Sequence, residues 1–325
     1  MKLESGDEIR IIAPSKSMKV LTKEQIDNAK IKLENMGFKV SYGKHVFESD
    51  EYYECASINS RLEDFNEALK DKNVKCIIAA RGGYNVNQLL DKIDYELVNK
   101  NKKIICGFSD ITALLNAIYK KTGIQTFSGP VFSNFGMKRG FEYTEEYFKK
   151  ILMNDEKIEI KSSEFFSDDK WYKNQEERNF IKNNGIKIIN EGKCSGTIIG
   201  GNLCTLNLLQ GTEYMPSLKN TILFIEDDNE TGDNFFVEFD RNLESLMQQK
   251  DFKYVKGIVF GRAQLGSKMT DEKWELMLKT KEKLKNIPIV INANFGHTTP
   301  VFTFPIGGKC HLKAMNNSVK ITIEK

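Results

Sequence analysis

The sequence contains little of several residue types, and it lacks two features that would indicate a membrane protein or a nucleic-acid-binding protein. Its 325 residues include only six prolines, three histidines and two tryptophans. No stretch approaches the roughly 18 consecutive apolar residues that a membrane-spanning helix requires. Neither sign of charge dominates, because 48 Lys and Arg are balanced by 45 Asp and Glu to a net charge of +3. Nucleic-acid-binding proteins usually carry a larger basic excess, so we expect neither nucleic acid nor a membrane as a partner.

Cysteine is present, but it lacks the spacing of a metal site or of a disulfide framework. The six cysteines form no C-x-x-C pair, and there is no H-E-x-x-H motif for zinc. Cys76 and Cys106 lie within apolar runs, where a free thiol packs as a small hydrophobe. The N-terminus also lacks the apolar segment of a secretory signal. These features predict a cytoplasmic protein without a structural metal.

Apolar runs alternate with helical patterns over residues 1–150. Strand-like runs at 8–14, 74–80 and 103–108 are separated by segments with helical periodicity, such as 22–36. Strands spaced by helices predict βαβ units and a parallel sheet. The fold class predicted for this first domain is therefore α/β.

The rest of the chain divides into two parts. Residues 151–192 are charged and show little periodicity, so we interpret them as a linker or a loop excursion, a kind of segment that is often functional. Residues 193–325 mix strand-like runs, among them 221–225 and 289–292, with helical segments, and end in two short alternating strands at 309–323. We expect a second α/β domain with more β structure.

The sharpest chemical signal is GFSD at residues 107–110, where a strand gives way to a helix. A serine in a tight turn at that place presents its hydroxyl at the carboxyl edge of the sheet, and the next N–H, on Asp110, can stabilise an oxyanion. The pattern departs from the G-x-S-x-G elbow because its fifth residue is Ile111. The alternative is that Ser109 or Asp110 only caps the following helix.

A serine nucleophile needs a base and an orienting carboxylate. His45 and His311 lie in ordinary polar segments, whereas His297 follows a strand-like run, where ligand-binding loops gather in open α/β sheets. Glu226 ends another such run, and its longer side chain favours it over Asp227 as the partner of a histidine on a neighbouring loop. The alternative is a loop histidine that only bonds nearby hydroxyls.

Two further motifs would indicate other ligands. Residues 227–238 have the acidic spacing of a calcium-binding loop, but the residues before them are strand-like and not helical, so we reject an EF-hand. The glycine clusters RGGYN at 81–85 and GGN at 200–202 match neither G-x-G-x-x-G nor a P-loop. Their backbone could serve an oxyanion or a phosphate, or they are tight turns.

Six blocks, taken together and in order, resemble the LD-carboxypeptidase family of serine peptidases. The blocks are RGGY at 81–84, GFSD at 107–110, GGN at 200–202, FIED at 224–227, KGIVFGR at 256–262 and GHT at 296–298. The resemblance implies a cofactor-free enzyme, usually a homodimer. It also implies an N-terminal flavodoxin- or Rossmann-like domain and a C-terminal domain with a β-rich core.

The same resemblance implies roles for individual residues. Ser109 would be the nucleophile, His297 the base and Glu226 its orienting acid. The oxyanion hole would use the N–H groups of Gly83 and Asp110.

Within that family the sequence looks closest to the microcin C immunity branch, which cleaves the amide-type bond between an aspartyl residue and an adenylate. GYNVNQLL at 83–90 and NFGHTTP at 294–300 carry this likeness, although Val86 stands where that branch has serine. The substrate expected is an aminoacyl or peptidyl nucleotide. The alternatives are a murein tetrapeptide as the substrate, or a non-catalytic module that binds a small anion.

We expect four further residues to bind substrate: Arg81, Asn85, Trp171 and Asn202. Trp171 lies in the 154–192 insert, which matches a loop whose aromatic residue contacts the nucleotide base in the microcin branch. The alternative for Trp171 is that it only anchors the insert against the protein.

Overall fold

The first part of the chain folds around a six-stranded sheet with the order β14-β5-β4-β3-β1-β2, in a computed structural model that describes residues 1–325. Its five parallel strands are β1 (Glu8–Ile12), β2 (Lys39–Tyr42), β3 (Val74–Ala79), β4 (Ile104–Gly107) and β5 (Thr126–Ser128). This is the flavodoxin-like order, in which the strand order reverses between β1 and β3 and opens a crevice at their carboxyl ends. The predicted α/β class is confirmed.

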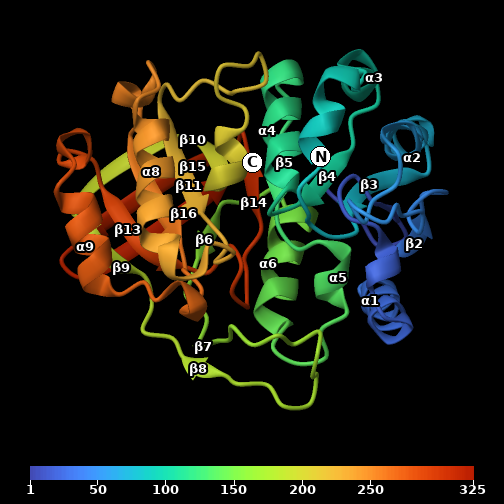
Figure 1. Ribbon diagram of the computed structural model, residues 1–325, viewed down its shortest axis with the longest axis horizontal. Helices are drawn as coiled ribbons and strands as arrows, with labels where there is room; N and C mark the ends of the chain where they lie inside the picture. Colours follow the sequence, from blue (N-terminus) through green and yellow to red (C-terminus); the bar gives the residue numbers. More distant parts are fainter.

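Helices connect these strands and pack in two groups. One group contains α1 (Lys23–Asn35) and α5 (Phe132–Phe135), and the other contains α2 (Ile58–Lys70), α3 (Tyr95–Lys100) and α4 (Ile111–Thr122). The chain then enters α6 (Glu142–Met153), which lies near the middle of the molecule in Figure 1. Local signals set the helix ends: a capping box of Thr22 and Gln25 begins α1, and Gly123, with a φ of 71°, ends α4.

The second part forms an eight-stranded sheet with the order β6-β16-β15-β10-β11-β12-β13-β9. Its central strands run parallel: β10 (Gly192–Asn202), β11 (Thr221–Glu226), β12 (Gly257–Gly261) and β13 (Ile289–Ala293). The predicted terminal strands are confirmed as β15 (Lys309–Met315) and β16 (Ser318–Glu324), which pair antiparallel. Three helices complete this part: α7 (Leu203–Asn207), α8 (Phe235–Met247) and α9 (Asp271–Lys279), of which α8 and α9 lie over one face of the sheet in Figure 1.

Residues 151–192 are not the structureless excursion that their composition suggested. β6 (Ile158–Ile160) and β9 (Lys187–Asn190) form the two edges of the large sheet, and β7 (Phe165–Phe166) pairs with β8 (Ile181–Lys182). These strands have only two to four residues, which is too short for an alternating pattern to stand out in the sequence.

One strand of the first sheet comes from the last part of the chain. β14 (Phe304–Ile306) comes from the last part of the chain, yet it pairs antiparallel with β5 in the first sheet. The boundaries 1–150, 151–192 and 193–325 therefore remain a proposal about domains, since the covalent order and the sheets differ at this strand.

A cluster of phenylalanines joins the two sheets. The ring of Phe224 on β11 lies 4.9 Å, centroid to centroid, from that of Phe304 on β14, and Phe295 and Phe302 complete the cluster. Such pairs add about 0.5–1.5 kcal/mol each beyond their burial. The cluster packs β11 of the second sheet against β14 of the first sheet. No helix combines the length and the apolar character needed to cross a membrane.

Candidate active site

Ser109 lies in a tight turn between β4 and α4, with a φ of 61°. A non-glycine residue takes this left-handed conformation only where its surroundings hold it there. Gly107 allows the close packing required, because a Cβ there would lie 2.9 Å from Cγ2 of Ile111. The turn thus has its tight contact without the second glycine of the G-x-S-x-G pattern.

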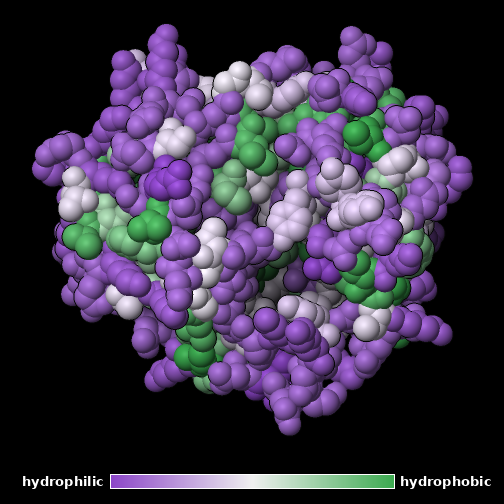
Figure 2. Space-filling view, viewed as in Figure 1, coloured by the Kyte–Doolittle hydropathy of each residue, from purple (hydrophilic) through white to green (hydrophobic).

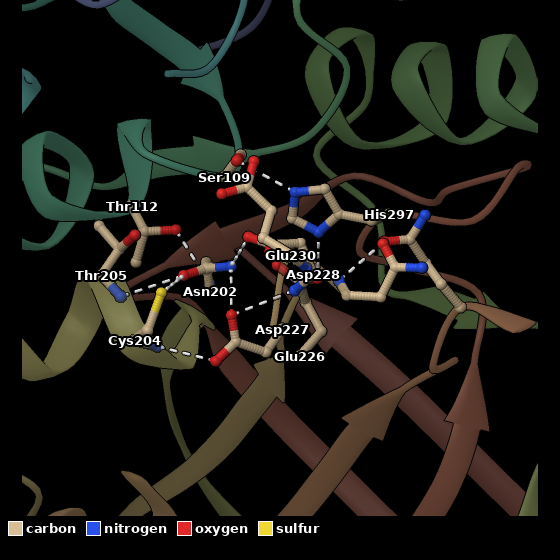
Figure 3. Close-up of polar contacts among 12 residues, drawn as sticks. Ser109, Thr112, Asn202, Cys204, Thr205, Glu226, Asp227, Asp228, Glu230 and His297 are labelled. Atoms are coloured by element: carbon tan, nitrogen blue, oxygen red, sulfur yellow. Dashed lines mark hydrogen bonds and ion pairs between the residues drawn. The ribbon is translucent and has the colours of Figure 1, made fainter. Parts of the chain in front are cut away.

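The structure brings Ser109, His297 and Glu226 into one chain of hydrogen bonds (Figure 3). Nε2 of His297 lies 3.0 Å from Oγ of Ser109, and its Nδ1 lies 2.6 Å from Oε2 of Glu226. In the neutral imidazole, with Nδ1–H donating to the carboxylate, Nε2 is the acceptor for the serine hydroxyl. The residues follow or end β4, β13 and β11, so both sheets contribute to the site.

The carboxylate of Glu226 is held in a tight, buried place. Its side chain is 4% exposed and that of His297 is 18% exposed. Gly296 has a φ of 104°, and a Cβ there would lie 2.6 Å from Oε2 of Glu226, so only glycine fits before the histidine.

Charge from three neighbouring carboxylates sets the protonation of the imidazole. Burial alone lowers the pKa of His297, but the charge of Glu226 and its hydrogen bond outweigh burial, and Asp228 and Asp227 add to them. The result raises the pKa of His297 from 6.5 to about 9. The imidazolium is therefore stabilised, which suits a group that must take up a proton from serine.

Two backbone donors beside the serine are free. The N–H groups of Gly83 and Asp110 make no hydrogen bond within the chain. The carboxylate of Asp110 ties the loop of Gly83 to the turn of the serine, because it accepts hydrogen bonds from the N–H groups of Asn85 at 2.9 Å and Val86 at 3.0 Å. It also accepts the hydroxyl of Ser15 at 2.5 Å. The position of the two free donors is thus fixed before any ligand arrives.

Burial and hydrogen bonding act in opposite directions on that carboxylate. Burial raises the pKa of Asp110, while the bonds from Ser15, Val86 and Asn85 oppose the rise. Sequence patterns did not point to Ser15, although it follows β1 at the crevice where the strand order reverses.

Arg81 and Trp171 reach the site, whereas Asn85 and Asn202 make internal contacts. Arg81 and Trp171 line a cavity of about 350 Å³ together with Ser109. Trp171 also lines an adjoining cavity of about 610 Å³. The face in Figure 2 is mainly hydrophilic and is hollowed near its middle, where the two parts of the molecule meet.

Asn85 and Asn202 are buried and line neither of those cavities. The amide of Asn85 lies against Tyr53, and Nδ2 of Asn202 donates to Oδ1 of Asp227 at 2.9 Å. Oδ1 of Asn202 accepts the N–H of Thr205 and so caps α7 (Figure 3). Their role in binding substrate stays a prediction.

Only one group of side chains near the site could hold a metal ion. The sulfur of Cys204 and carboxylate oxygens of Asp227 and Asp228 lie within 4.8 Å of one another. Asp227 already accepts bonds from Asn202 and from the N–H of Cys204, and burial raises the pKa of the Cys204 thiol. The segment follows strand β11 and not a helix, as the rejection of an EF-hand requires.

Comparison with protein-family models decides the family. The model of the LD-carboxypeptidase N-terminal domain matches residues 9–129, and that of the C-terminal domain matches residues 195–312. The chain belongs to the LD-carboxypeptidase family. Members of this family are serine peptidases, and this protein is one of them.

Individual relatives agree over the full length of the chain. The putative carboxypeptidase YocD of Bacillus subtilis is 48% identical over 324 residues, which cover 100% of this chain and 98% of YocD. The crystal structure of an MccF-like protein from Bacillus anthracis superposes with a TM-score of 0.99 at 51% identity, covering 100% of this chain and 98% of that chain.

The microcin C7 self-immunity protein MccF of Escherichia coli is more distant. It is 33% identical over 98% of this chain and 94% of its own length. Its structure in complex with aspartyl sulfamoyl adenosine has a TM-score of 0.89, covering 100% of this chain and 97% of that chain.

Proposed function

We propose that the protein hydrolyses a peptide-like amide bond in an aminoacyl or peptidyl nucleotide of the microcin C type. Ser109, His297 and Glu226 are its catalytic triad. The observation that carries the proposal is the hydrogen-bonded chain from Glu226 through His297 to Ser109, at 2.6 and 3.0 Å. This order of acid, base and nucleophile is the arrangement that acyl transfer requires.

The proposed reaction runs in two halves. Oγ of Ser109 attacks the carbonyl carbon of the amide while its proton moves to Nε2 of His297. The oxyanion that forms accepts hydrogen bonds from the N–H groups of Gly83 and Asp110. The C–N bond then breaks, and His297 gives the proton to the leaving nitrogen. In the second half, water attacks the acyl-serine with His297 as base, and the carboxylic acid leaves as the Ser109 hydroxyl is restored.

The cavities beside the triad support a nucleotide as the leaving group. Trp171 and Tyr172 line both the 350 Å³ and the 610 Å³ cavity, and their rings lie 6.0 Å apart at 83°. Stacking of a base on an aromatic side chain contributes about 1–3 kcal/mol. Lys16 and Arg81 line the smaller of the two cavities and supply positive charge for a phosphate or a sulfamoyl group.

The remaining parts of the proposal concern partners and place. All six cysteines are free, which favours a reducing compartment such as the cytoplasm. The triad needs no cofactor, and the family resemblance favours a homodimer, which analytical ultracentrifugation would test.

The test uses aspartyl sulfamoyl adenosine, the ligand of MccF, as substrate. We expect the wild type to release aspartate and sulfamoyl adenosine, and Ser109→Ala to bind the compound without cleaving it. Murein tetrapeptide, assayed in parallel, is the comparator. Faster release of its terminal D-alanine than of sulfamoyl adenosine would show that murein tetrapeptide is the better substrate and would overturn the proposed substrate class. Full activity of Ser109→Ala would overturn the proposed triad.

A further inference from the structure

A third cavity opens onto Ser109, on the side away from Trp171. Its volume is about 290 Å³, and Ser109, Gly83 and Asp110 form one end of it. It therefore begins at the nucleophile and at both proposed oxyanion donors. A substrate whose nucleotide occupies the aromatic side must place its acyl group here, because the scissile carbonyl lies between the two.

The charged side chains that line this cavity are all acidic. Besides Asp110, whose carboxylate accepts the bonds from Ser15, Asn85 and Val86, four carboxylates line it, and no lysine, arginine or histidine does. The four are Asp227, Asp228, Glu230 and Glu238. Glu238 is paired with Arg241 at 2.6 Å, whereas the other three form no salt bridge. The cations of the site, Lys16 and Arg81, line only the cavity on the nucleotide side. Asp228 and Glu230 line that cavity too, so negative charge lies on both sides of Ser109, whereas the positive charge lies only on the nucleotide side.

The acidic side chains are held in place from behind. Nδ2 of Asn202 donates to Asp227 at 2.9 Å, and the N–H of Glu230 donates to Asp228 at 3.0 Å. The hydroxyl of Tyr84 donates to the carboxylate of Glu230. Figure 3 shows these carboxylates beside the triad. None of these bonds brings a positive charge, so the carboxylates are held in place without a cationic partner.

Burial and the crowding of the carboxylates raise the pKa of one of them, Asp227. Burial, together with the charges of Glu226 and Asp228, raises the pKa of Asp227 from 3.8 to about 7. A cation between these groups would relieve that repulsion. The rest of the wall is apolar, with Leu208, Phe235 and Phe239. This combination suits a side chain with an aliphatic stem and a charged end.

We infer that this cavity binds the acyl group of the substrate and selects one with a cationic side chain, such as lysyl or arginyl, over neutral or acidic ones. The inference rests on the proposed function, because it assumes that the leaving group lies on the Trp171 side. Asp228 and Glu230, which line both cavities, are the specificity-determining residues.

The experiment compares three sulfamoyl adenosines that differ only in the acyl group: lysyl, norleucyl and aspartyl. Norleucyl matches the lysyl stem without its charge. We expect kcat/KM to fall from lysyl to norleucyl by roughly 10- to 100-fold, the range of a charged hydrogen bond, and to fall again for aspartyl. Dissociation constants of Ser109→Ala for the three compounds should follow the same order, which separates binding from chemistry.

Two variants locate the preference. Asp228→Asn with Glu230→Gln keeps the shapes and removes two charges, so the lysyl-to-norleucyl ratio should fall to near one. The ratio is the readout because Asp228 also affects the pKa of His297, and that effect is common to both substrates. Asp233→Asn is the matched control: it lies in the same loop, outside the cavity and paired with Lys268, and should leave the ratio unchanged.

The outcomes are distinguishable. Turnover of all three compounds with norleucyl or aspartyl preferred would overturn the inference and leave the proposed function standing. Neither turnover nor binding of any of them would overturn both. A lysyl preference that disappears in EDTA would assign the carboxylates to a metal ion and likewise overturn the inference.

Discussion

The molecule contains two Ser–His–Glu chains of hydrogen bonds, and their distances are similar. In the first, Ser109, His297 and Glu226 are joined at 3.0 and 2.6 Å. In the second, Oγ of Ser195 lies 2.6 Å from Nδ1 of His311, and Nε2 of that ring lies 2.7 Å from Oε1 of Glu324. Hydrogen-bond geometry alone would therefore nominate both.

Their surroundings differ in backbone conformation, in nearby backbone donors and in the burial of the acid. Ser195 lies within the extended strand β10, directly opposite His311 on β15, so the pair results from strand register. Ser109 lies at a left-handed turn before a helix, with free N–H groups beside it. Glu324 is 24% exposed and is also paired with Lys157, whereas Glu226 is 4% exposed.

Because Ser195 and His311 also line a cavity, of about 390 Å³, burial of the acid and free backbone donors are what distinguish the proposed triad from the cross-strand contact. The donors matter because they stabilise charge that develops only in the transition state. Burial of Glu226 matters because solvent screens the charge of an exposed carboxylate, which then stabilises the protonated histidine only weakly.

The largest expected effect is on the serines themselves. Ser109→Ala should lower kcat by at least about 10³-fold, leaving only binding and oxyanion stabilisation, while Ser195→Ala should retain wild-type turnover. Steady-state hydrolysis of an aminoacyl sulfamoyl adenosine measures both. Loss of activity in Ser195→Ala at an unchanged melting temperature would contradict the distinction.

The backbone donors are tested by Gly83→Ala. A Cβ there would lie 2.3 Å from Oγ of Ser15 and 3.1 Å from the backbone nitrogen of Lys16, so we expect the N–H of residue 83 to move away from the oxyanion position. Loss of one such donor typically lowers kcat by about 10²–10³-fold. The dissociation constant of the substrate should change much less. Wild-type kcat in a folded Gly83→Ala protein would remove Gly83 from the oxyanion hole.

The pH profile tests the electrostatics of the base. His297 must lose its proton before it can accept one from Ser109, and its pKa is raised to about 9. We therefore expect kcat/KM to rise about tenfold per pH unit from pH 7 and to level off above about pH 9.

Glu226→Gln removes the charge that raises this pKa, so the rising limb should move toward or below 6.5 even as the maximum rate falls. His311→Gln is the control from the second chain and should leave the profile unchanged. A rising limb that still levels off near pH 9 in Glu226→Gln would show that the carboxylate of Glu226 does not raise the pKa of His297.

The smallest of these effects concerns the aromatic side of the site. Trp171→Ala should reduce kcat/KM for an aminoacyl sulfamoyl adenosine by roughly 5- to 150-fold, because base stacking is lost. A substrate without a base, such as murein tetrapeptide, should be nearly indifferent. Equal losses on both substrates would show that Trp171 only anchors the insert.

Much of the fold follows from local patterns. Each parallel strand of the first sheet is a short apolar run, and Ser109, Glu226 and His297 drew attention because each follows or ends such a run. Strand ends of parallel sheets meet at one edge, so sequence position alone suggests proximity. Only the structure shows that these three side chains, from two sheets, are joined by hydrogen bonds of 2.6 and 3.0 Å.

What sequence could not show depends on distant pairing. β14 joins the first sheet across more than half of the chain, and β6 and β9 gain strand structure only from the sheet edges they complete. The second Ser–His–Glu chain is of the same kind, since His311 sits in an ordinary polar segment and meets Ser195 through register. The amide of Asn202 donates to Asp227, a contact that no local pattern encodes, and its predicted role in binding substrate stays a prediction.

The most direct test of Ser109 as nucleophile is the covalent intermediate. Wild-type enzyme would be mixed with an aminoacyl sulfamoyl adenosine, quenched in acid during the first turnover, digested and analysed by mass spectrometry. The proposed mechanism predicts the acyl mass on the peptide that contains Ser109 and none on the peptide that contains Ser195. An acyl group on the Ser195 peptide, or complete turnover with no acyl-enzyme on either peptide, would contradict it.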